Sequence, residues 1–483
     1  MFKYLILNVT NYTWCLFVGE SYTTGSRELD KLIGELPPRT MLLIAGHPGA
    51  GKTTLASQIC YANALRGKKC LYITFYEDKD KLYRNMGRLG INLAEVESKG
   101  LLTYVKLPVS STEGLLNAIS DILAKGHYDV VVVDSINPAL ELLERIEAQR
   151  AILLNFFYQL TSLINGLLVT VAEVPLGKEY PDIGSMEFVP DAILYVKHRM
   201  TRGLLHRALE IRKLRGAPLA VVEVPFSIIG GGGFKAYIPP KPERVLSSRE
   251  EALGMTISVV KELIGPLYKG DVLYVSYPPH ARDPVVTIPL IDLAITNSVR
   301  VLFVSYKYSS DEVLEVLTMA VNKYLGLSLA EASELISKCF HLESINPASY
   351  AVSHLHALTV ELVDDLRPSV VVFHGTEVFR AISDPQEYWG ALINELTWFK
   401  NIGKLVVRYG SRVDPYWTRM NEAVSDAVIR LYYKRSDKQL TPLCSVWRRG
   451  RSPAVISLDG EVLRRIEEDL NKLANIARER IAQ

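Results

Sequence analysis

The chain of 483 residues has little of several features that mark specialised classes of protein. Its five cysteines include no C-x-x-C pair, so neither a disulfide framework nor a structural zinc site is expected, and a reducing cytoplasm fits. Its formal net charge of +2 lacks the basic excess typical of proteins that bind nucleic acids or acidic membranes. No uninterrupted apolar run reaches the roughly 18 residues of a membrane span. These absences leave a globular protein, and the length suits two domains of about 200 residues each.

The first 21 residues are mostly apolar but carry polar interruptions at Asn8, Asn11 and Thr13. No small-residue cleavage site follows them, which argues against a signal peptide. We interpret this segment as a peripheral strand or an N-terminal extension, and we expect no membrane insertion.

An internal repeat relates the two halves of the chain at an offset of about 230 residues. The segment LLIAGHPGAGKTTL at 42–55 falls on LYVSYPPHARDPVV at 273–286, and DVVVVDS at 129–135 falls on SVVVFHG at 369–375. Several such landmarks recur in the same order with nearly constant spacing, which chance matches would not maintain. The chain is therefore predicted to be a tandem duplication.

The first copy contains the pattern G-x-x-x-x-G-K-T between an apolar strand and an amphipathic helix. Glycines let the backbone N–H groups wrap phosphates, Lys52 places a positive charge near the β- and γ-phosphates, and the Thr53 hydroxyl can bind magnesium. The strand-to-helix context disfavours the alternative of a simple glycine turn. The candidate nucleotide-binding residues are Gly46, His47, Pro48, Gly49, Ala50, Gly51, Lys52, Thr53 and Thr54.

Two carboxylates follow apolar strands of the first copy. Asp134 ends YDVVVVD, a β-branched run typical of a central parallel strand, so it reaches the ligand-binding edge of the sheet and can hold a magnesium-bound water. A turn-capping role is the alternative, and the upstream phosphate loop favours magnesium. Glu77 follows KCLYITF and can orient and deprotonate the water that attacks the γ-phosphate. The residues alone equally allow a solvated acid at Glu77.

Together, GHPGAGKTT, ITFYEDKDKLYRNMGRLGIN, VVVVDS, GSMEFVPDAI and KLRG followed by VPFSI resemble the KaiC branch of the RecA-type ATPases. The resemblance is strong over 22–240 and weaker over 253–457. It implies an α/β fold of two tandem RecA-like P-loop domains with mainly parallel central sheets, the second degenerate. The remaining parts would be an extension (1–21), a linker (241–252) and a C-terminal amphipathic helix (458–483).

The resemblance also implies ATP and Mg²⁺ as ligands, with the metal held by Thr53 and Asp134. It implies a homo-oligomeric ring, commonly a hexamer, with nucleotide between neighbouring subunits. The family's pair of water-activating glutamates falls on Tyr76 and Glu77, so this chain keeps the second alone.

The KLRG segment is, by resemblance, contributed across the subunit boundary, so Lys213 and Arg215 would touch the neighbour's phosphates. Its basic surroundings also allow a solvated hairpin edge. A DNA-binding interpretation is disfavoured because the chain has neither interleaved aromatic residues nor an overall positive charge.

The second copy has lost the chemical residues of the first. Asp283 replaces Lys52 and would repel a polyanion, His280 and Arg282 stand where backbone groups must approach a phosphate, and Pro284 removes a donor. We interpret 253–457 as a pseudo-ATPase domain with an architectural or partner-binding role.

The leading hypothesis is a cytoplasmic ATPase that binds MgATP in its first domain and whose nucleotide state governs assembly or signalling. The expected catalytic residues are Glu77, Lys52, Lys213 and Arg215. The alternatives are an ATP sensor or scaffold with negligible hydrolysis and a recombinase-like DNA repair accessory protein. A protein partner is expected, but the sequence does not identify it.

Overall fold

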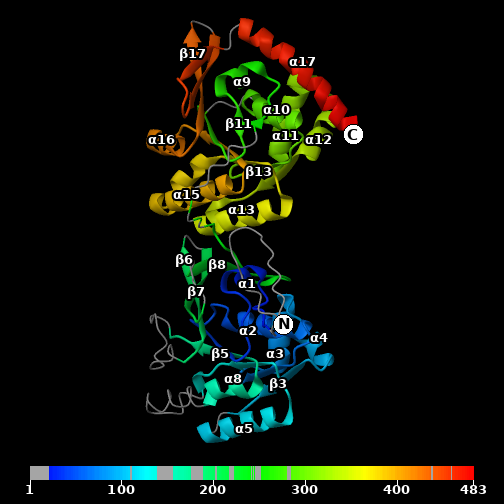
Figure 1. Cartoon of the computed structure of the whole chain (residues 1–483), viewed down its shortest axis with the longest axis vertical. Coiled ribbons are helices and arrows are strands. Elements are labelled where there is room, and N and C mark those ends of the chain that lie inside the picture. Colours follow the sequence, from blue (N-terminus) through cyan, green and yellow to red (C-terminus); the bar gives the residue numbers. More distant parts are fainter. Residues whose placement is uncertain are drawn as a thin grey trace, which may run out of the picture. The chain divides into compact units, whose positions relative to one another are not determined.

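The computed structural model describes residues 21–108, 111–138, 156–175, 189–201, 204–216, 222–240, 242, 244, 252–279, 284–436, 439–457 and 460–482. The chain divides between Ile238 and Pro239 into two compact units, called domain 1 and domain 2 below. Each unit has its own large sheet with helices packed against it (Figure 1). The predicted N-terminal extension and most of the predicted linker lie outside the described residues.

The sheet of domain 1 has nine strands in the order β3-β2-β4-β5-β1-β6-β7-β8-β9. The strands from β3 to β6 in this order pair in parallel, and the last three join through antiparallel pairs. The strands are β1 (Thr40–Gly46), β2 (Cys70–Thr74), β3 (Leu102–Lys106), β4 (Val130–Asp134), β5 (Leu167–Glu173), β6 (Ala192–Thr201), β7 (Leu204–Leu214), β8 (Glu223–Ile229) and β9 (Gly233–Ala236).

Two apolar cores lie on opposite faces of this sheet because successive strand residues point to opposite sides. Leu42 and Ile44 of β1 join the core that α2 covers, while Met41 and Leu43 join the core that α5 and α8 cover. The described helices are α1 (Arg27–Ile33), α2 (Lys52–Leu65), α3 (Lys79–Arg88), α4 (Leu93–Ser98), α5 (Thr112–Lys125) and α8 (Tyr158–Ile164).

Domain 2 repeats this arrangement with the strand order β14-β13-β15-β16-β12-β17-β18-β19. Each strand occupies the place of its counterpart in domain 1, with β12 at the position of β1 and β15 at that of β4. The prediction of two tandem RecA-like α/β domains is therefore confirmed. The strands are β12 (Val272–Tyr277), β13 (Val301–Ser305), β14 (Phe340–Ser344), β15 (Val370–His374), β16 (Leu405–Ser411), β17 (Ala427–Ser436), β18 (Gln439–Arg448) and β19 (Ala454–Ser457), with a separate pair β10 (Ala252–Leu253) and β11 (Leu267–Tyr268).

Two helices of domain 2 begin with clear local signals. Both α11 and α12 start with capping boxes, formed by Ser309 with Glu312 and by Ser328 with Glu331. The helices and 3-10 turns are α9 (Ser258–Ile264), η3 (Pro284–Thr287), α10 (Ile288–Asn297), α11 (Ser310–Leu325), α12 (Leu329–Cys339), η4 (Pro347–Ser349), α13 (Val352–Leu366), η5 (Thr376–Val378), α14 (Phe379–Ile382), α15 (Pro385–Asn401), α16 (Pro415–Ala423) and α17 (Gly460–Ala482).

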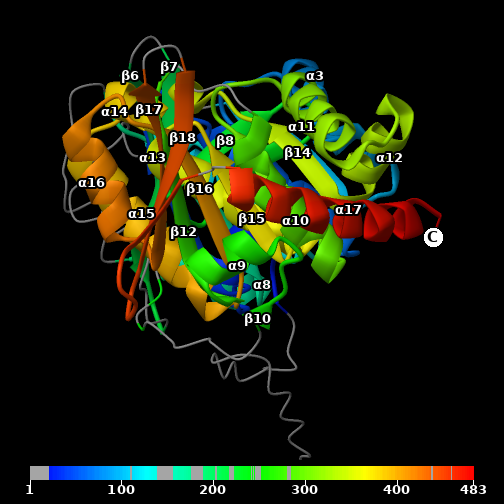
Figure 2. The same ribbon diagram turned by 90° about the horizontal axis from the view of Figure 1, so that it is seen from above.

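The C-terminal helix α17 lies along its own domain, next to α10 (Figure 2). Leu470 and Leu473 are buried in the core of domain 2, whereas Leu463 near the start of the helix is 45% exposed. The apolar stripe of this helix therefore packs against the sheet-covering helices of domain 2.

Across the described segments, no single helix is long and apolar enough to cross a membrane. The two helices α11 and α12, bent by 120° at their junction, satisfy the length and composition of a span only when taken together. Both contribute buried residues, such as Leu317 and Leu335, to the core of domain 2.

Candidate functional site

The loop between β1 and α2 depends on glycine for its shape. Gly46, Gly49 and Gly51 have φ angles of 154°, 77° and 111°, which residues with a side chain rarely adopt. A Cβ atom at Gly46 would also lie 2.2 Å from the carbonyl oxygen of Val196 on β6. With Gly51 as the N-cap of α2, the first N–H groups of the helix point toward the loop, where an anion can accept their hydrogen bonds.

Lys52 crosses back over its own loop. Its side chain is buried, and its Nζ donates a hydrogen bond to the carbonyl oxygen of His47 at 3.0 Å. Burial lowers the pKa of Lys52, while the carboxylates of Glu173 and Asp134 raise it. The loop thus holds the ammonium group of Lys52 with two carboxylates nearby. A site for a magnesium-bound nucleotide needs such a cation for the phosphates and carboxylate oxygens near the metal.

Asp134 ends β4 and receives hydrogen bonds from two directions. The Tyr72 hydroxyl on the neighbouring strand β2 donates to its Oδ2 at 2.8 Å, and the Thr53 hydroxyl lies close enough to lower the pKa of the carboxyl by hydrogen bonding. Burial raises the pKa of Asp134, and the bonds from Tyr72 and Thr53 partly offset that rise. The structure therefore places Thr53 and Asp134, the two predicted magnesium-binding residues, side by side.

These two residues form a donor set that fits magnesium. Mg²⁺ binds oxygen ligands and usually keeps several waters, so one hydroxyl, one carboxylate and the phosphates of a nucleotide can complete its shell. In the parts of the chain that the structure describes, no group of three or more His, Cys, Asp or Glu residues could hold a metal ion by itself.

Glu173 is a carboxylate at this site that the sequence analysis did not include. It ends β5, in register with Gly46 on β1. Asn137 holds this strand end, since its Oδ1 accepts from the Glu173 N–H at 2.7 Å and its Nδ2 donates to the Glu173 carbonyl oxygen at 3.2 Å. The sequence did contain a signal, because LLVTVAE ends an apolar run in a carboxylate just as VVVVD does.

Glu77 lies after β2 with its main chain held firmly. Its N–H donates to Thr74 Oγ1 at 3.3 Å, and its carbonyl oxygen accepts from the Tyr104 hydroxyl at 2.7 Å. Its carboxylate forms an ion pair with Lys81, with Oε1 and Nζ 3.1 Å apart, and the preceding Tyr76 is 68% exposed. A role as the catalytic base therefore requires the Glu77 side chain to leave Lys81.

Lys213 and Arg215 lie at the opposite end of the sheet from the phosphate loop. Lys213 on β7 is in register with Ile193, and Arg215 Nη1 contacts Asp191 Oδ1 at 3.1 Å. Asp191 in turn accepts a hydrogen bond from the N–H of Met41, near the start of β1. Because β1 runs from there to the loop, about 15–20 Å separates KLRG from the phosphates of its own chain.

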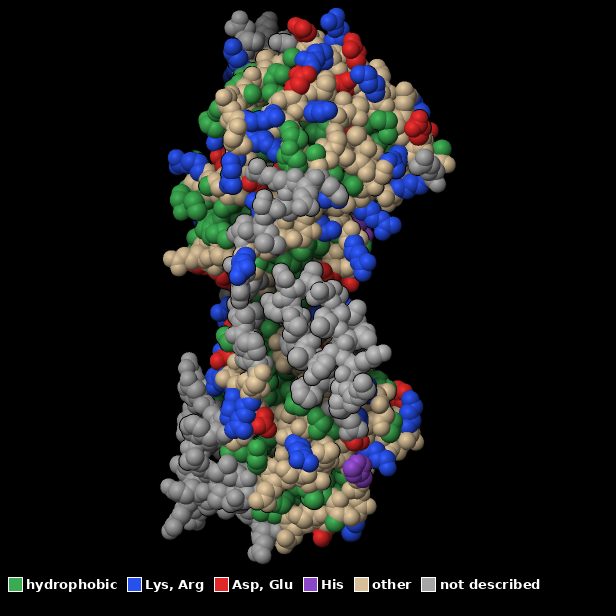
Figure 3. Space-filling view, viewed as in Figure 1, with side chains coloured by type: hydrophobic (Ala, Val, Ile, Leu, Met, Phe, Trp, Pro, Cys, Tyr) green, Lys and Arg blue, Asp and Glu red, His purple; other side chains and the backbone are tan. Residues whose placement is uncertain are grey.

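Charged side chains do not gather into one basic field on the face drawn in Figure 3, where Lys and Arg of the described residues are interspersed with Asp and Glu. Several cations of domain 1 are paired with acids on their own domain. Lys197 lies within ion-pair distance of Glu210 and Glu223, and Lys106 pairs with Asp78. This arrangement does not favour a nucleic-acid interface.

The corresponding region of domain 2 has a different structure. Residues 280–283, which include the predicted Asp283 replacement, lie outside the described part of the chain. After β12, the backbone at Pro284–Thr287 forms a 3-10 turn, and α10 begins at Ile288. Within the described residues, the first α-helix after β12 thus begins eleven positions after that strand ends, whereas α2 begins six positions after the end of β1.

His374 occupies the position of Asp134 in this second sheet. Its Nδ1 lies 3.3 Å from Ser305 Oγ, its Nε2 lies 3.5 Å from the Tyr277 hydroxyl, and its ring stacks on Tyr308 with centroids 5.3 Å apart. Burial is the main cause that lowers the pKa of His374 to about 4, with the carboxylate of Glu377 opposing this shift and Lys307 adding to it. The carboxylate of Asp134 in domain 1 is thus replaced by a neutral ring packed among aromatic side chains.

The glycine loop, the buried lysine and the strand-end aspartate on a mainly parallel sheet define a P-loop nucleotide-binding domain of the RecA type. Residues 22–240 match the family model described as the KaiC ATPase. The first domain is therefore a KaiC-like P-loop ATPase domain, as the sequence motifs predicted.

The chain is similar to two kinds of known protein. It is 28% identical over 203 residues to the circadian clock protein KaiC3 of Synechocystis sp. PCC 6803, and the aligned region covers 40% of this chain and 39% of that protein. It is 25% identical over 205 residues to the circadian clock oscillator protein KaiC of Parathermosynechococcus lividus, with 40% and 37% covered. It is 27% identical over 250 residues to a UPF0273 protein of Methanopyrus kandleri, with 47% and 94% covered. The chain thus spans about two fifths of the KaiC relatives and nearly all of the UPF0273 protein.

Proposed function

We propose that the protein binds MgATP in domain 1 and hydrolyses it to ADP and phosphate, and that the nucleotide state governs its assembly or its signalling to a protein partner. The observation that carries this proposal is the joint geometry of the loop. Lys52 bridges the loop from within, and Thr53 and Asp134 meet beside it. This arrangement provides both the cation for the phosphates and the oxygen ligands for the metal.

Each group has a separate task when nucleotide is bound. The loop N–H groups hold the phosphate oxygens, and Lys52 neutralises charge on the β- and γ-phosphates. Thr53 would bind Mg²⁺ directly and Asp134 would hold one of its waters, and the metal neutralises the charge that develops during phosphoryl transfer. Tyr72 orients Asp134 through its hydrogen bond.

Hydrolysis also needs a base that positions the attacking water. Glu77 is our leading assignment, after its carboxylate leaves Lys81. Glu173 is the second candidate, because its carboxylate lies close enough to influence the pKa of both Lys52 and Asp134. If neither performs this task, the protein would be the ATP sensor or scaffold with negligible hydrolysis.

The position of Lys213 and Arg215 supports a proposal of assembly. Because these residues lie far from their own phosphate loop, a role at the γ-phosphate is open to them only across a subunit boundary. We therefore propose a homo-oligomer, with a ring as the geometry that gives every loop a neighbour.

The described cysteines, Cys60, Cys70, Cys339 and Cys444, are free thiols and suit the cytoplasm.

Calorimetric titration of the full chain with ATP and magnesium tests this function. One site per chain is expected, and Lys52→Ala should abolish binding or weaken it strongly. Lys125→Ala, which removes an exposed lysine at the end of α5, is the matched control and should bind like the parent. Absence of binding by the parent would overturn the proposed function, and two sites per chain would overturn the pseudo-ATPase assignment of domain 2. Phosphate release by the parent separates hydrolysis from the sensor alternative.

A further inference from the structure

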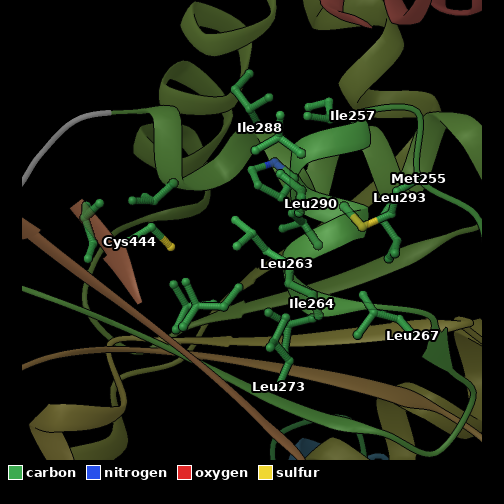
Figure 4. Close-up of a pocket in the computed structure, with 18 of the residues that line it drawn as sticks. Met255, Ile257, Leu263, Ile264, Leu267, Leu273, Ile288, Leu290, Leu293 and Cys444 are labelled. Carbon is green, nitrogen blue, oxygen red and sulfur yellow. The ribbon is translucent and has the colours of Figure 1, made fainter. Parts of the chain in front are cut away.

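Domain 2 contains an apolar pocket of about 150 Å³ between its sheet and the helices α9, α10 and α17. Figure 4 shows Leu290 and Leu293 of α10 and Leu263 of α9 converging on this space, with Cys444 of β18 at another side. The sheet closes the remaining wall through apolar residues of β12, β16 and β17. The pocket lies wholly within one domain.

The lining of the pocket is uncharged. Tyr409 and Cys444 are its two polar side chains, and the Tyr409 hydroxyl already donates to the carbonyl oxygen of Val286 at 3.2 Å. Burial raises the pKa of Cys444 to about 11, so its thiol is protonated near neutral pH and is a weak hydrogen-bond donor. The lining therefore offers nothing that would offset the cost of desolvating a charged ligand.

The pocket borders the surface as well as the core. Val260, Ile466 and Pro289 are only partly buried, and they come from the three helices that surround the opening. Ile288 and Leu290 on the inner side are almost completely buried. A ligand could thus enter between α9, α10 and α17 and remain in contact with all three.

The position and volume of the pocket suggest a binding site rather than a small packing defect. Empty volume in a core lowers stability in proportion to its size, so a void this large would ordinarily be filled by side chains. An apolar cavity of about this volume can hold a benzene-sized molecule. Val286, Ile288 and Pro289 also place the pocket beside η3, in the region that corresponds to the phosphate loop of domain 1.

We propose that domain 2 binds a small uncharged apolar molecule in this pocket, a hydrocarbon ring or branched chain of about the size of benzene. Because Ile466 of α17 belongs to the lining, the ligand contacts the C-terminal helix as well as the core. Binding therefore stabilises domain 2 against unfolding, by an amount that grows with ligand concentration. This site is independent of nucleotide binding by domain 1.

Thermal unfolding of the full chain with benzene, cyclohexane or benzoate tests the proposal. Four of the five tryptophans lie in domain 2, at positions 389, 398, 417 and 447, so tryptophan fluorescence chiefly follows that domain. Benzene and cyclohexane near saturation should raise the unfolding midpoint by several degrees, and benzoate should not. No shift with either hydrocarbon, or an equal shift with benzoate, would overturn the assignment.

Two variants locate the binding site. Val260→Phe places a larger side chain in the pocket and should remove the shift that benzene produces. Lys261→Phe introduces the same side chain at an exposed position of α9 and should retain the shift. Retention of the full shift by a folded Val260→Phe protein would place benzene elsewhere.

Thiol modification of the parent gives an answer that does not depend on any variant. Cys444 lines the pocket, whereas Cys339 is half-buried on α12 and does not line it. Benzene should slow modification of Cys444 by a small methanethiosulfonate severalfold and leave Cys339 unchanged, as measured by peptide mass spectrometry. Equal rates at Cys444 with and without benzene would contradict the proposal.

Discussion

Replacing Tyr72 by phenylalanine should weaken magnesium binding without disturbing the phosphate loop. The Tyr72 side chain is almost fully buried, and its hydroxyl donates to Asp134 Oδ2 at 2.8 Å while lying 3.4 Å from Ser57 Oγ. Phenylalanine keeps the ring and its stacking on Tyr104, with centroids 6.0 Å apart. The substitution therefore removes the hydrogen bond to the carboxylate and the longer one that Ser57 donates to the hydroxyl, and it leaves the ring packing in place.

The size of the effect follows from the charge on Asp134. A hydrogen bond to a charged group contributes about 1.5–3 kcal/mol, which corresponds to a pKa change of about 1–2 units. Burial already raises the pKa of Asp134, and the Tyr72 bond lowers it, so loss of that bond raises the pKa further. A carboxylate with a higher pKa becomes protonated sooner as the pH falls, and the protonated form no longer attracts the metal.

Magnesium titrations at fixed ATP concentration, repeated between about pH 6 and pH 8, measure this effect. Tyr72→Phe should need more magnesium than the parent, and the deficit should grow toward low pH by up to about tenfold for each unit of pKa change. Tyr104→Phe is the control, because that hydroxyl donates to the Glu77 carbonyl oxygen instead of to Asp134. A deficit that is absent, or that stays constant with pH, would refute the reasoning.

Three further predictions concern the base, the subunit boundary and the pH dependence of stability. Glu77→Gln should leave ATP affinity within about twofold of the parent and cut phosphate release. If Glu77→Gln releases phosphate as fast as the parent while Glu173→Gln does not, Glu173 is the base instead. Mixing Lys52→Ala chains with Arg215→Ala chains should restore some turnover, provided that differently tagged chains co-purify, and a protein that stays monomeric with MgATP would contradict the shared site. Burial raises the pKa of Glu395 to about 8, so the folded state keeps a proton that the unfolded state releases. The contribution of Glu395 to the stability of domain 2 should therefore fall as pH rises from about 4.5 to about 8, by at most about 1.4 kcal/mol per unit. The buried His356 and His374, whose pKa values burial lowers, make the opposite contribution below about pH 6.5, so the effect is measured as the difference in stability between the parent and Glu395→Gln, which should shrink over this range in denaturant titrations followed by tryptophan fluorescence.

The sequence predicted most of the fold because the duplication supplied the same information twice. A single apolar run does not specify its neighbours in a sheet, but matched runs in matched order indicate two copies of one topology. The position of β1 between β5 and β6 could not be read from local patterns, since its partners are more than 100 residues away in the chain. That arrangement became an expectation only through the resemblance to a known family.

The predicted parts of the site are those encoded locally. Lys52 and Thr53 stand in one motif, and Asp134 ends a recognisable strand. Tyr72 was missed because its contact with Asp134 joins residues 62 positions apart, and it depends on β2 and β4 being adjacent and in register. Whether an aromatic residue inside a strand packs in the core or serves a carboxylate is decided by that register, which the sequence does not specify.

The two strand-end residues Asp134 and His374 explain how one fold can support two different sites. Asp134 needs the Tyr72 and Thr53 donors because a buried carboxylate without partners would destabilise the domain. His374 is neutral at ordinary pH, since burial lowers its pKa, and its ring stacks on Tyr308. Replacement of the strand-end carboxylate by a neutral ring removes one buried charge that would need polar partners. An apolar pocket is therefore compatible with the second copy. In the first copy it would desolvate the charged groups that bind phosphate and magnesium, which is costly in free energy.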